Sequence, residues 1–242
     1  MRVSCFECAL RRSGGFKPVS DMELTFINEM KRDHLVCPPG AEIIAAGQEQ
    51  VELYTLYSGW AFRFKMLPDG RRQILNIHLP GDLIGLQGAM FDAPSYGVEA
   101  LTEVQICVLP RRKVWPLFRN MPELSFDVTW LGAREESHVD EGLTSVGRRN
   151  AVERIAALII LLYKRLDALG MVINSAMPFP LTQQHIADML GLSLVHTNKS
   201  LAKLRRLGMF SLTNGMLLLS NPRALESMAQ YFEEETAKRP LI

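Results

Sequence analysis

The 242-residue sequence lacks an apolar run long enough to cross a membrane. Its longest one, AALIILLY at 156–163, is far shorter than the roughly 20 residues that a transmembrane helix needs. The N-terminus, MRVSCFECALRRSGG, also lacks the continuous apolar core of a secretory signal. We therefore expect a cytoplasmic protein with no membrane partner.

A strong net charge is absent as well, because 27 Lys and Arg balance 26 Asp and Glu to a net charge of +1. Affinity for nucleic acid would therefore have to come from a local patch. Cysteine is scarce, and without an export signal the four thiols are expected to be reduced or to bind metal, not to form structural disulfides. The apolar content of 48% and the length indicate a globular protein with room for two ordinary domains.

Little in the sequence indicates catalysis. It contains no nucleophile elbow, phosphate-cradling loop or zinc-spaced quartet. His78 alternates with apolar neighbours in a strand-like run, so we interpret it as a solvated or hydrogen-bonded sheet residue and not as a lone metal ligand. The five histidines are scattered over the chain: His34, His78, His138, His185 and His196. We predict that the protein is not an enzyme.

Short β-prone runs are present from about residue 35 to 112, separated by turn signals. Pro68-Asp69-Gly70 and Pro80-Gly81-Asp82 supply a preset φ and a residue that tolerates positive φ. Many short strands at this spacing predict a β-sandwich or jelly roll.

A different pattern occupies residues 121–147, where Leu124, Val128 and Leu131 begin a helical stripe that continues to Val146. The stripe is narrow and interrupted by polar groups, so we expect this long helix to pair with a copy of itself. A lone helix packed over the β domain is the alternative. Gly147 and the two arginines after it indicate a hinge. The predicted domains are a β domain with a short N-terminal segment at 1–120, a dimerisation helix at 121–147 and a further domain at 148–242.

Residues 181–208, LTQQHIADMLGLSLVHTNKSLAKLRRLG, indicate a helix, a tight turn at Gly191 and a second helix. Thr182 and Ser193 can cap the two helices. One face of each helix is apolar or small and should point inward: Ile186, Ala187 and Leu190 in the first, Thr197, Leu201 and Leu204 in the second. The outer face of the second helix is basic and carries an amide, which suits the major groove of double-stranded DNA.

A hairpin is predicted directly after these helices, because Asn214-Gly215 separates two short β-prone runs. Helix, turn, helix and hairpin together form a winged helix. Residues 181–208 carry four Lys and Arg against one acid, as contact with phosphates requires. A purely structural helix pair, and a ligand-binding β-roll protein that uses the winged helix for protein contacts, are the alternatives.

The order of these parts resembles the Crp/Fnr family of bacterial transcription regulators, from about residue 18 to 222. LYTLYSGWAFRFKMLPDGRRQILNIHLPGDLIG resembles the family's cyclic-nucleotide-binding-type roll, and NAVERIAALIILL resembles the helix that opens its DNA-binding domain. The resemblance implies an α+β fold with a β-roll, a long dimerisation helix and a winged helix-turn-helix. It also implies a homodimer that binds a palindromic operator and recruits or blocks RNA polymerase.

The resemblance places the base contacts at Val195, Asn198 and Lys199. Lys199 can donate to guanine, and Asn198 can pair with adenine. Gln183 and Ser193 are candidates for phosphate contacts near helix N-termini. The complete predicted DNA-binding set is Thr182, Gln183, Ser193, Val195, His196, Asn198, Lys199 and Lys203.

The sensing half departs from the cyclic-AMP-responsive branch of the family. There a Gly-Glu pair binds the ribose and an Arg-Ser pair the phosphate, whereas this chain has Gly85-Leu86 and Ser95-Tyr96. Losing the guanidinium removes a charge-assisted contact worth on the order of 1.5–3 kcal/mol. We therefore expect that cyclic AMP is not bound in the family manner, and the effector stays unknown.

The oxygen-sensing branch holds an iron–sulfur cluster on three N-terminal cysteines and one in the roll. Cys5, Cys8 and Cys107 match three of these, but Gly14 stands near the third N-terminal position, and a four-iron cluster usually needs four thiolates. Cys37, at the start of the first predicted strand, is expected to be packed. The resemblance leaves three interpretations: a cluster on Cys5, Cys8 and Cys107, a mononuclear metal or thiol redox switch through Cys5 and Cys8, or a core role for Cys107 with Cys5 and Cys8 on a mobile terminus.

Overall fold

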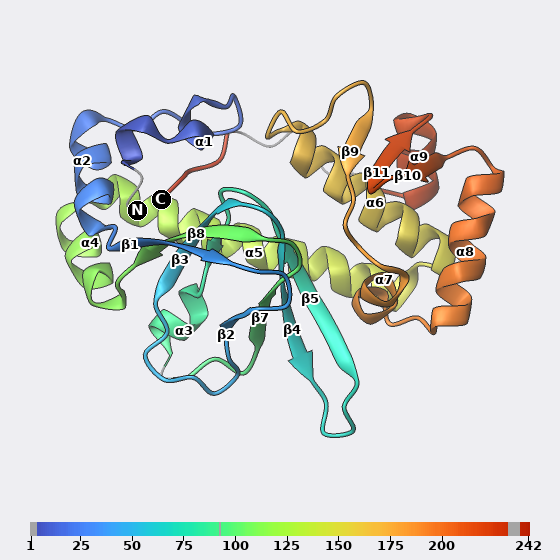
Figure 1. Cartoon of the computed structure of the whole chain (residues 1–242), viewed down its shortest axis with the longest axis horizontal. Coiled ribbons are helices and arrows are strands. Elements are labelled where there is room, and N and C mark those ends of the chain that lie inside the picture. The colour runs from blue at the N-terminus through green and yellow to red at the C-terminus, as the bar shows by residue number, and fades with distance from the viewer. Residues whose placement is uncertain (1–3, 92, 232–237) are drawn as a thin grey trace. The chain divides into compact units, whose positions relative to one another are not determined.

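A computed structural model describes residues 4–91, 93–231 and 238–242 (Figure 1). These residues form two compact units. The first contains the residues up to Arg71, then Leu75–Ser137 and Lys238–Ile242, and the second contains Arg72–Ile74 and the residues from His138 to Tyr231. Residues 238–242, which fall in the predicted domain 148–242, therefore pack in the first unit.

Two four-stranded sheets form the β-roll of the first unit, as predicted from the short strands and their turns. The side chains between them are aliphatic and fully buried, among them Ile44, Leu56, Val98 and Ile106. One sheet has the order β1-β8-β3-β6, from Asp33–Cys37, Val104–Leu109, Leu53–Ser58 and Leu83–Ile84. The other has the order β2-β7-β4-β5, from Glu42–Ile44, Gly97–Ala100, Ala61–Met66 and Arg72–His78.

Short helices lie around the roll. Ser20 caps α2 in a capping box with Glu23, and Ile27 and Met30 of that helix are buried in the core of the unit. The helices and their bounds are η1 (Cys5–Glu7), α1 (Ala9–Arg12), α2 (Asp21–Met30), α3 (Leu86–Met90), η2 (Arg111–Lys113) and α4 (Val114–Asn120).

Two expectations about the roll need correction. His78 is only 2% exposed, so it is not solvated, because both faces of β5 are covered near its end, where Asn76 and Ile77 are buried too. The other half of that expectation, a hydrogen-bonded sheet residue, is not contradicted, since Nδ1 of His78 lies 4.0 Å from the Asp82 carboxylate. Cys37 ends the first strand and does not start it. Strand β1 already begins at Asp33 and pairs with β8, and its burial does not alternate, so the period-2 signal was missing.

The long helix α5 runs from Pro122 to Arg148, close to the predicted range. Leu124, Val128 and Leu131 are buried in the core of the first unit. The first half of this helix is therefore packed on its own β domain, as in the alternative given above, and is not available to pair with a copy. In its second half Leu143 is 71% exposed and Val146 is 36% exposed, so here the stripe that begins at Leu124 leaves apolar side chains uncovered.

The second unit is built around α6 (Ala151–Asp167), whose apolar side chains form its core. Asn150 accepts hydrogen bonds from the backbone N–H of Val152 and Glu153, which fixes where this helix starts. The other elements are β9 (Ala176–Pro178), α7 (Gln183–Leu190), α8 (Leu194–Arg206), β10 (Phe210–Thr213), β11 (Met216–Leu219) and α9 (Pro222–Ala229). The three strands form one sheet in the order β10-β11-β9. None of the helices in the described part of the chain is long and apolar enough to span a membrane.

Candidate nucleic-acid interface

The first helix of the predicted pair, α7, begins and ends where its sequence dictates. The Thr182 hydroxyl accepts from the backbone N–H of His185, and Nδ1 of His185 accepts from the N–H of Thr182, each at 3.2 Å. Gly191 ends the helix with φ +61°, a left-handed conformation that favours glycine. Ile186, Ala187 and Leu190 are buried, so the predicted inner face is confirmed.

The second helix, α8, has one buried and one exposed face. Ser193 caps it by accepting from the backbone N–H of His196 at 3.3 Å. Thr197, Ser200, Leu201 and Leu204 are buried on the side that packs against α6 and α7. All of the residues predicted to contact bases or phosphates are exposed: Thr182, Gln183, Ser193, Val195, His196, Asn198, Lys199 and Lys203. The fold therefore leaves this set free to meet a partner, with Thr182 and Ser193 serving as helix caps as well.

The exposed face of α8 carries lysines and arginines, and Asp188, the one acid of residues 181–208, is paired elsewhere. Asp188 accepts from the Gln184 amide at 2.6 Å and pairs with the Arg72 guanidinium at 3.0 Å. Lys199, Lys203, Arg205 and Arg206 are exposed along α8. The sequence pattern identified the basic residues but did not reveal that Asp188 is paired, since Arg72 lies more than a hundred residues earlier.

The predicted hairpin is confirmed. Asn214 and Gly215 have φ +51° and +74°, as a two-residue type I′ turn requires. Strand β10 is antiparallel to β11, with Phe210 opposite Leu219 at one end and Thr213 opposite Met216 at the other. Phe210, Leu217 and Leu219 are buried. The third strand of this sheet, β9, was not predicted, because the three residues AMP give too short a pattern to recognise.

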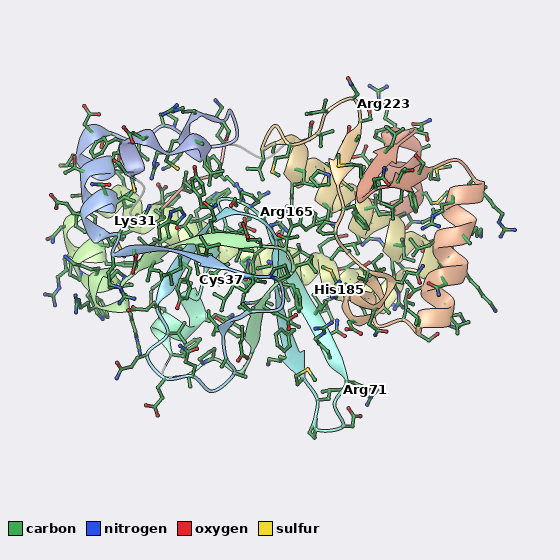
Figure 2. All side chains as sticks on the ribbon, viewed as in Figure 1. Lys31, Cys37, Arg71, Arg165, His185 and Arg223 are labelled. Carbon is green, nitrogen blue, oxygen red and sulfur yellow. The ribbon has the colours of Figure 1, made fainter. Side chains whose placement is uncertain are left out.

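His185 lies on α7 (Figure 2), and its titration should make the stability of the helix pair depend on pH. Burial, and secondarily the charge of Arg72, lower its pKa below the ordinary 6.5. The unfolded chain therefore takes up this proton first, so the stability of the folded chain falls as the pH drops below 6.5. Protonation also removes the Nδ1 acceptor of the capping box, which is worth about 1 kcal/mol.

We therefore expect the wild-type protein to lose urea resistance between pH 7.5 and 5 in part through this residue. The His185→Gln variant keeps a side-chain acceptor for the capping box but does not titrate. Its urea midpoint, followed by circular dichroism, should fall less over the same range. Equal losses in the two proteins would show that His185 does not contribute.

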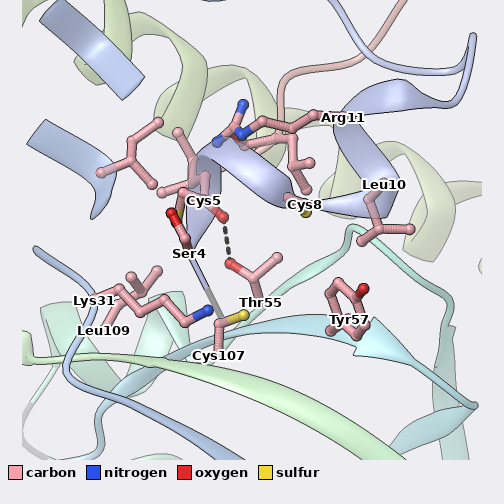
Figure 3. Close-up of a pocket in the computed structure, with 13 residues that line it drawn as sticks. Ser4, Cys5, Cys8, Leu10, Arg11, Lys31, Thr55, Tyr57, Cys107 and Leu109 are labelled. Carbon is pink, nitrogen blue, oxygen red and sulfur yellow. Dashed lines mark hydrogen bonds between the residues drawn. The ribbon is translucent and has the colours of Figure 1, made fainter. Parts of the chain in front are cut away.

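Cys5, Cys8 and Cys107 line one cavity of the first unit, with Cys5 and Cys8 on the N-terminal segment and Cys107 on β8 (Figure 3). Cys5 is 8% exposed, and its backbone N–H donates to the Asn28 Oδ1 at 3.0 Å. The interpretation of Cys5 and Cys8 as lying on a mobile terminus is therefore wrong for Cys5. Cys37, which packs beside another part of the core, does not line this cavity.

The cavity does not fit a four-iron cluster. It offers three of the four thiolates, and no group of three Cys, His, Asp or Glu in the described residues could hold a metal ion. Burial raises the pKa of Cys107 and outweighs the opposing charge of Lys31. A thiol with a raised pKa is a poor nucleophile at neutral pH, so Cys107 is also unsuited to fast oxidation.

Tyr96 stands where the family's phosphate-binding pair would be, and it is only 4% exposed. The Arg63 guanidinium lies 5.1 Å from the centre of its ring and pairs with Glu135 at 3.2 Å. The arginine beside Tyr96 is therefore already engaged, by the aromatic ring and by the Glu135 carboxylate.

Comparison with known proteins agrees with this architecture. A model of the cyclic nucleotide-binding domain matches residues 34–121, and a model of the Crp-like helix-turn-helix domain matches residues 153–228. The nitrogen fixation regulation protein FixK of Bradyrhizobium diazoefficiens is 28% identical over 226 residues, which cover 93% of each chain. FixK of Rhizobium meliloti is 30% identical over 191 residues, covering 78% of this chain and 84% of that one.

A solved structure of FixK2 from Bradyrhizobium japonicum has the same fold, with a TM-score of 0.73 and 23% identity over 85% of this chain and 98% of that one. FixK2 thus shares the fold of this chain. The two curated relatives are regulation proteins by name. The chain belongs to the Crp/Fnr family of transcriptional regulators and carries the family's DNA-binding domain.

Proposed function

We propose that this regulator acts as a homodimer that places one α8 helix of each subunit in the major groove of a palindromic operator. The observation that carries this proposal is the division of α8 into a buried face, with Leu201 and Leu204, and an exposed basic face, with Lys199 and Lys203. A helix held from one side presents the other side to base edges as a rigid unit. Binding of chromosomal DNA puts its action in the cytoplasm.

The second half of α5 supports dimerisation. Val139, Leu143 and Val146 stand at positions i, i+4 and i+7 and so share one face of the helix. Leu143 and Val146 are exposed in the single chain. A second copy of the helix would cover them, as in a two-stranded coiled coil. The bound dimer then recruits or blocks RNA polymerase, which the resemblance to the family implies.

The effector that we propose is not cyclic AMP held in the family manner, because Tyr96 and the Arg63–Glu135 pair take the place of the phosphate grip. The alternatives of an iron–sulfur cluster on Cys5, Cys8 and Cys107 and of a metal or thiol switch through Cys5 and Cys8 stay predictions; against the cluster stands the lack of a fourth thiolate in the cavity. The protein that uses its winged helix only for protein contacts is the remaining alternative.

The test is selection of binding sites from a random double-stranded DNA library, followed by mobility shifts with the selected duplex. We expect two symmetric half-sites with centres about 10 base pairs apart, because two reader helices of a dimer are separated by about one DNA turn. The logarithm of the affinity should fall linearly with the logarithm of the salt concentration. Failure to enrich any symmetric site would favour the protein-contact alternative.

A further inference from the structure

The last five residues of the chain lie in the first unit, called the sensor unit from here on. The described residues from His138 to Tyr231 belong to the second unit, called the DNA-binding unit. Residues 238–242, called the tail here, run beside the N-terminal segment (Figure 1). The parallel bridge joins Phe16 to Arg239. The backbone N–H of Lys17 donates to the Arg239 carbonyl at 2.9 Å, and the N–H of Arg239 donates to the Gly15 carbonyl at 3.3 Å. The tail is thus held by backbone pairing, as in strand addition.

The side chain of Arg239 is held by three groups from the sensor unit. It forms an ion pair with Asp82, donates to the Pro80 carbonyl and lies 4.8 Å from the centre of the Phe16 ring. Both members of the ion pair are 13% exposed. A partly buried, charge-assisted contact of this kind is stronger than a surface salt bridge.

Gly81 makes room for this contact. Its φ is +87°, and a Cβ at this position would lie 2.2 Å from the Phe16 ring and 2.9 Å from Nη2 of Arg239. The turn Pro80-Gly81-Asp82 therefore does more than reverse the chain, since its glycine, carbonyl and carboxylate together form the receptor for one guanidinium.

The end of the tail fills apolar space. Leu241 is 2% exposed and Ile242 is 6% exposed. Nη2 of Arg11 donates to the Leu241 carbonyl at 3.0 Å, and the Thr55 hydroxyl donates to the Ile242 oxygen at 2.5 Å. Both residues line the same cavity as Cys5, Cys8 and Cys107, and the dashed line in Figure 3 marks the contact with Thr55. A molecule entering this cavity would meet the tail.

We propose that the sensor unit contains a docking site for the segment Arg239-Pro-Leu-Ile and that docking of the tail regulates operator binding. A docked tail connects the units in addition to α5 and the segment Arg72–Ile74. The chain from Tyr231 to Lys238 can extend by at most about 3.6 Å per residue, so docking limits the movement of the DNA-binding unit. Displacement of the tail by an apolar effector in the cavity would remove that limit.

The first test compares hydrogen exchange in full-length Arg239→Ala and Lys238→Ala proteins. The Lys238 side chain is exposed, so its removal is the matched loss of one positive charge. In Arg239→Ala we expect the backbone amides of Lys17 and Leu241 to exchange about tenfold faster or more, because two charge-assisted contacts are lost. Protection of Ile186 and Leu201 should be unchanged, which confirms that the variant is folded. Unchanged exchange at Lys17 would overturn the docking site.

The second test measures operator affinity of the same proteins and rests on the proposed function. The operator affinity of Arg239→Ala should differ from that of Lys238→Ala by about threefold or more. The reason is that loss of docking changes the fraction of subunits whose DNA-binding unit is oriented for operator binding. An acetylated peptide of residues 238–242, added to Arg239→Ala, should protect Lys17 again but leave the affinity altered, because it does not connect the units.

Each remaining outcome contradicts the proposal. Equal affinities of the two variants would mean that the tail docks without regulating. Restoration of operator affinity by the peptide would mean that occupancy of the docking site is sufficient and that the connection between the units is not needed. If no variant and not even the wild type binds the operator, the proposed function fails, while the exchange experiment still decides whether the tail docks.

Discussion

Lys199→Ala is expected to lower operator affinity by roughly 1–3 kcal/mol per half-site. The side chain is exposed on α8, and its four-carbon stem can carry the amino group to a guanine edge or to a phosphate. Because a dimer loses the contact twice, the combined loss reaches about 30-fold at the lower limit of this range. Mobility shifts with the selected operator at fixed salt measure it.

Two comparisons identify the contact that Lys199 makes. If it contacts a base, the variant loses discrimination at one base pair and keeps its salt dependence. If it contacts a phosphate, discrimination is kept and the salt slope falls by about 1 per subunit, or about 2 for the dimer. Arg223→Ala is the matched control, because this exposed arginine lies on α9 of the same unit. Operator affinity equal to that of wild type would refute the assignment of Lys199.

Leu143→Asp is expected to convert the dimer to a monomer. If a second α5 helix covers this side chain, the substitution removes two buried leucines from the interface, each worth about 1.5–3 kcal/mol, and places two charges in their position. A loss on the order of 4 kcal/mol corresponds to about a thousandfold in the dimerisation constant. Light scattering over a dilution series measures the change, and operator affinity should fall with it.

The single chain should tolerate this substitution, since Leu143 is 71% exposed in it. Met22→Asp is the matched control, because Met22 is 67% exposed on α2 of the sensor unit. Leu143→Met keeps apolar volume and should keep the dimer. A Leu143→Asp protein that remains dimeric at low micromolar concentration would rule out this face of α5 as the interface.

Local patterns predicted the DNA-binding unit well, because its elements begin and end at residues with a local physical role. Asn150, Thr182 and Ser193 cap helices, and Asn214-Gly215 adopts the positive φ angles of its turn. The inner face of α8 follows from the helical period alone. Here sequence and structure agree because each signal acts over only a few residues.

Features that depend on distant partners were not predicted. The stripe of α5 has one period along its whole length, yet Leu124 and Val128 are buried in their own chain while Leu143 is exposed. Which part of a stripe is covered depends on what folds against it, and no local pattern records that.

The tail is the clearest example of the same limit. The sequence FEEETAKRP suggested a frayed helix at 232–240, of which residues 232–237 lie outside the described part. Lys238 to Pro240 are not helical, and Pro240 disfavours a helical conformation in Arg239 before it. The pairing of Arg239 with Phe16 and Asp82 joins residues more than 150 positions apart, so composition could not reveal it.

The separation of duties on α8 has a consequence for how this regulator can diverge. Thr197 and Leu204, fully enclosed, anchor the helix, whereas Val195, Asn198 and Lys199 carry no share of that anchoring. If α8 reads the operator as proposed, substitutions at these exposed positions can change the preferred operator sequence without lowering the stability of the fold. A duplicated copy of this regulator could therefore acquire a different operator specificity while keeping the same fold.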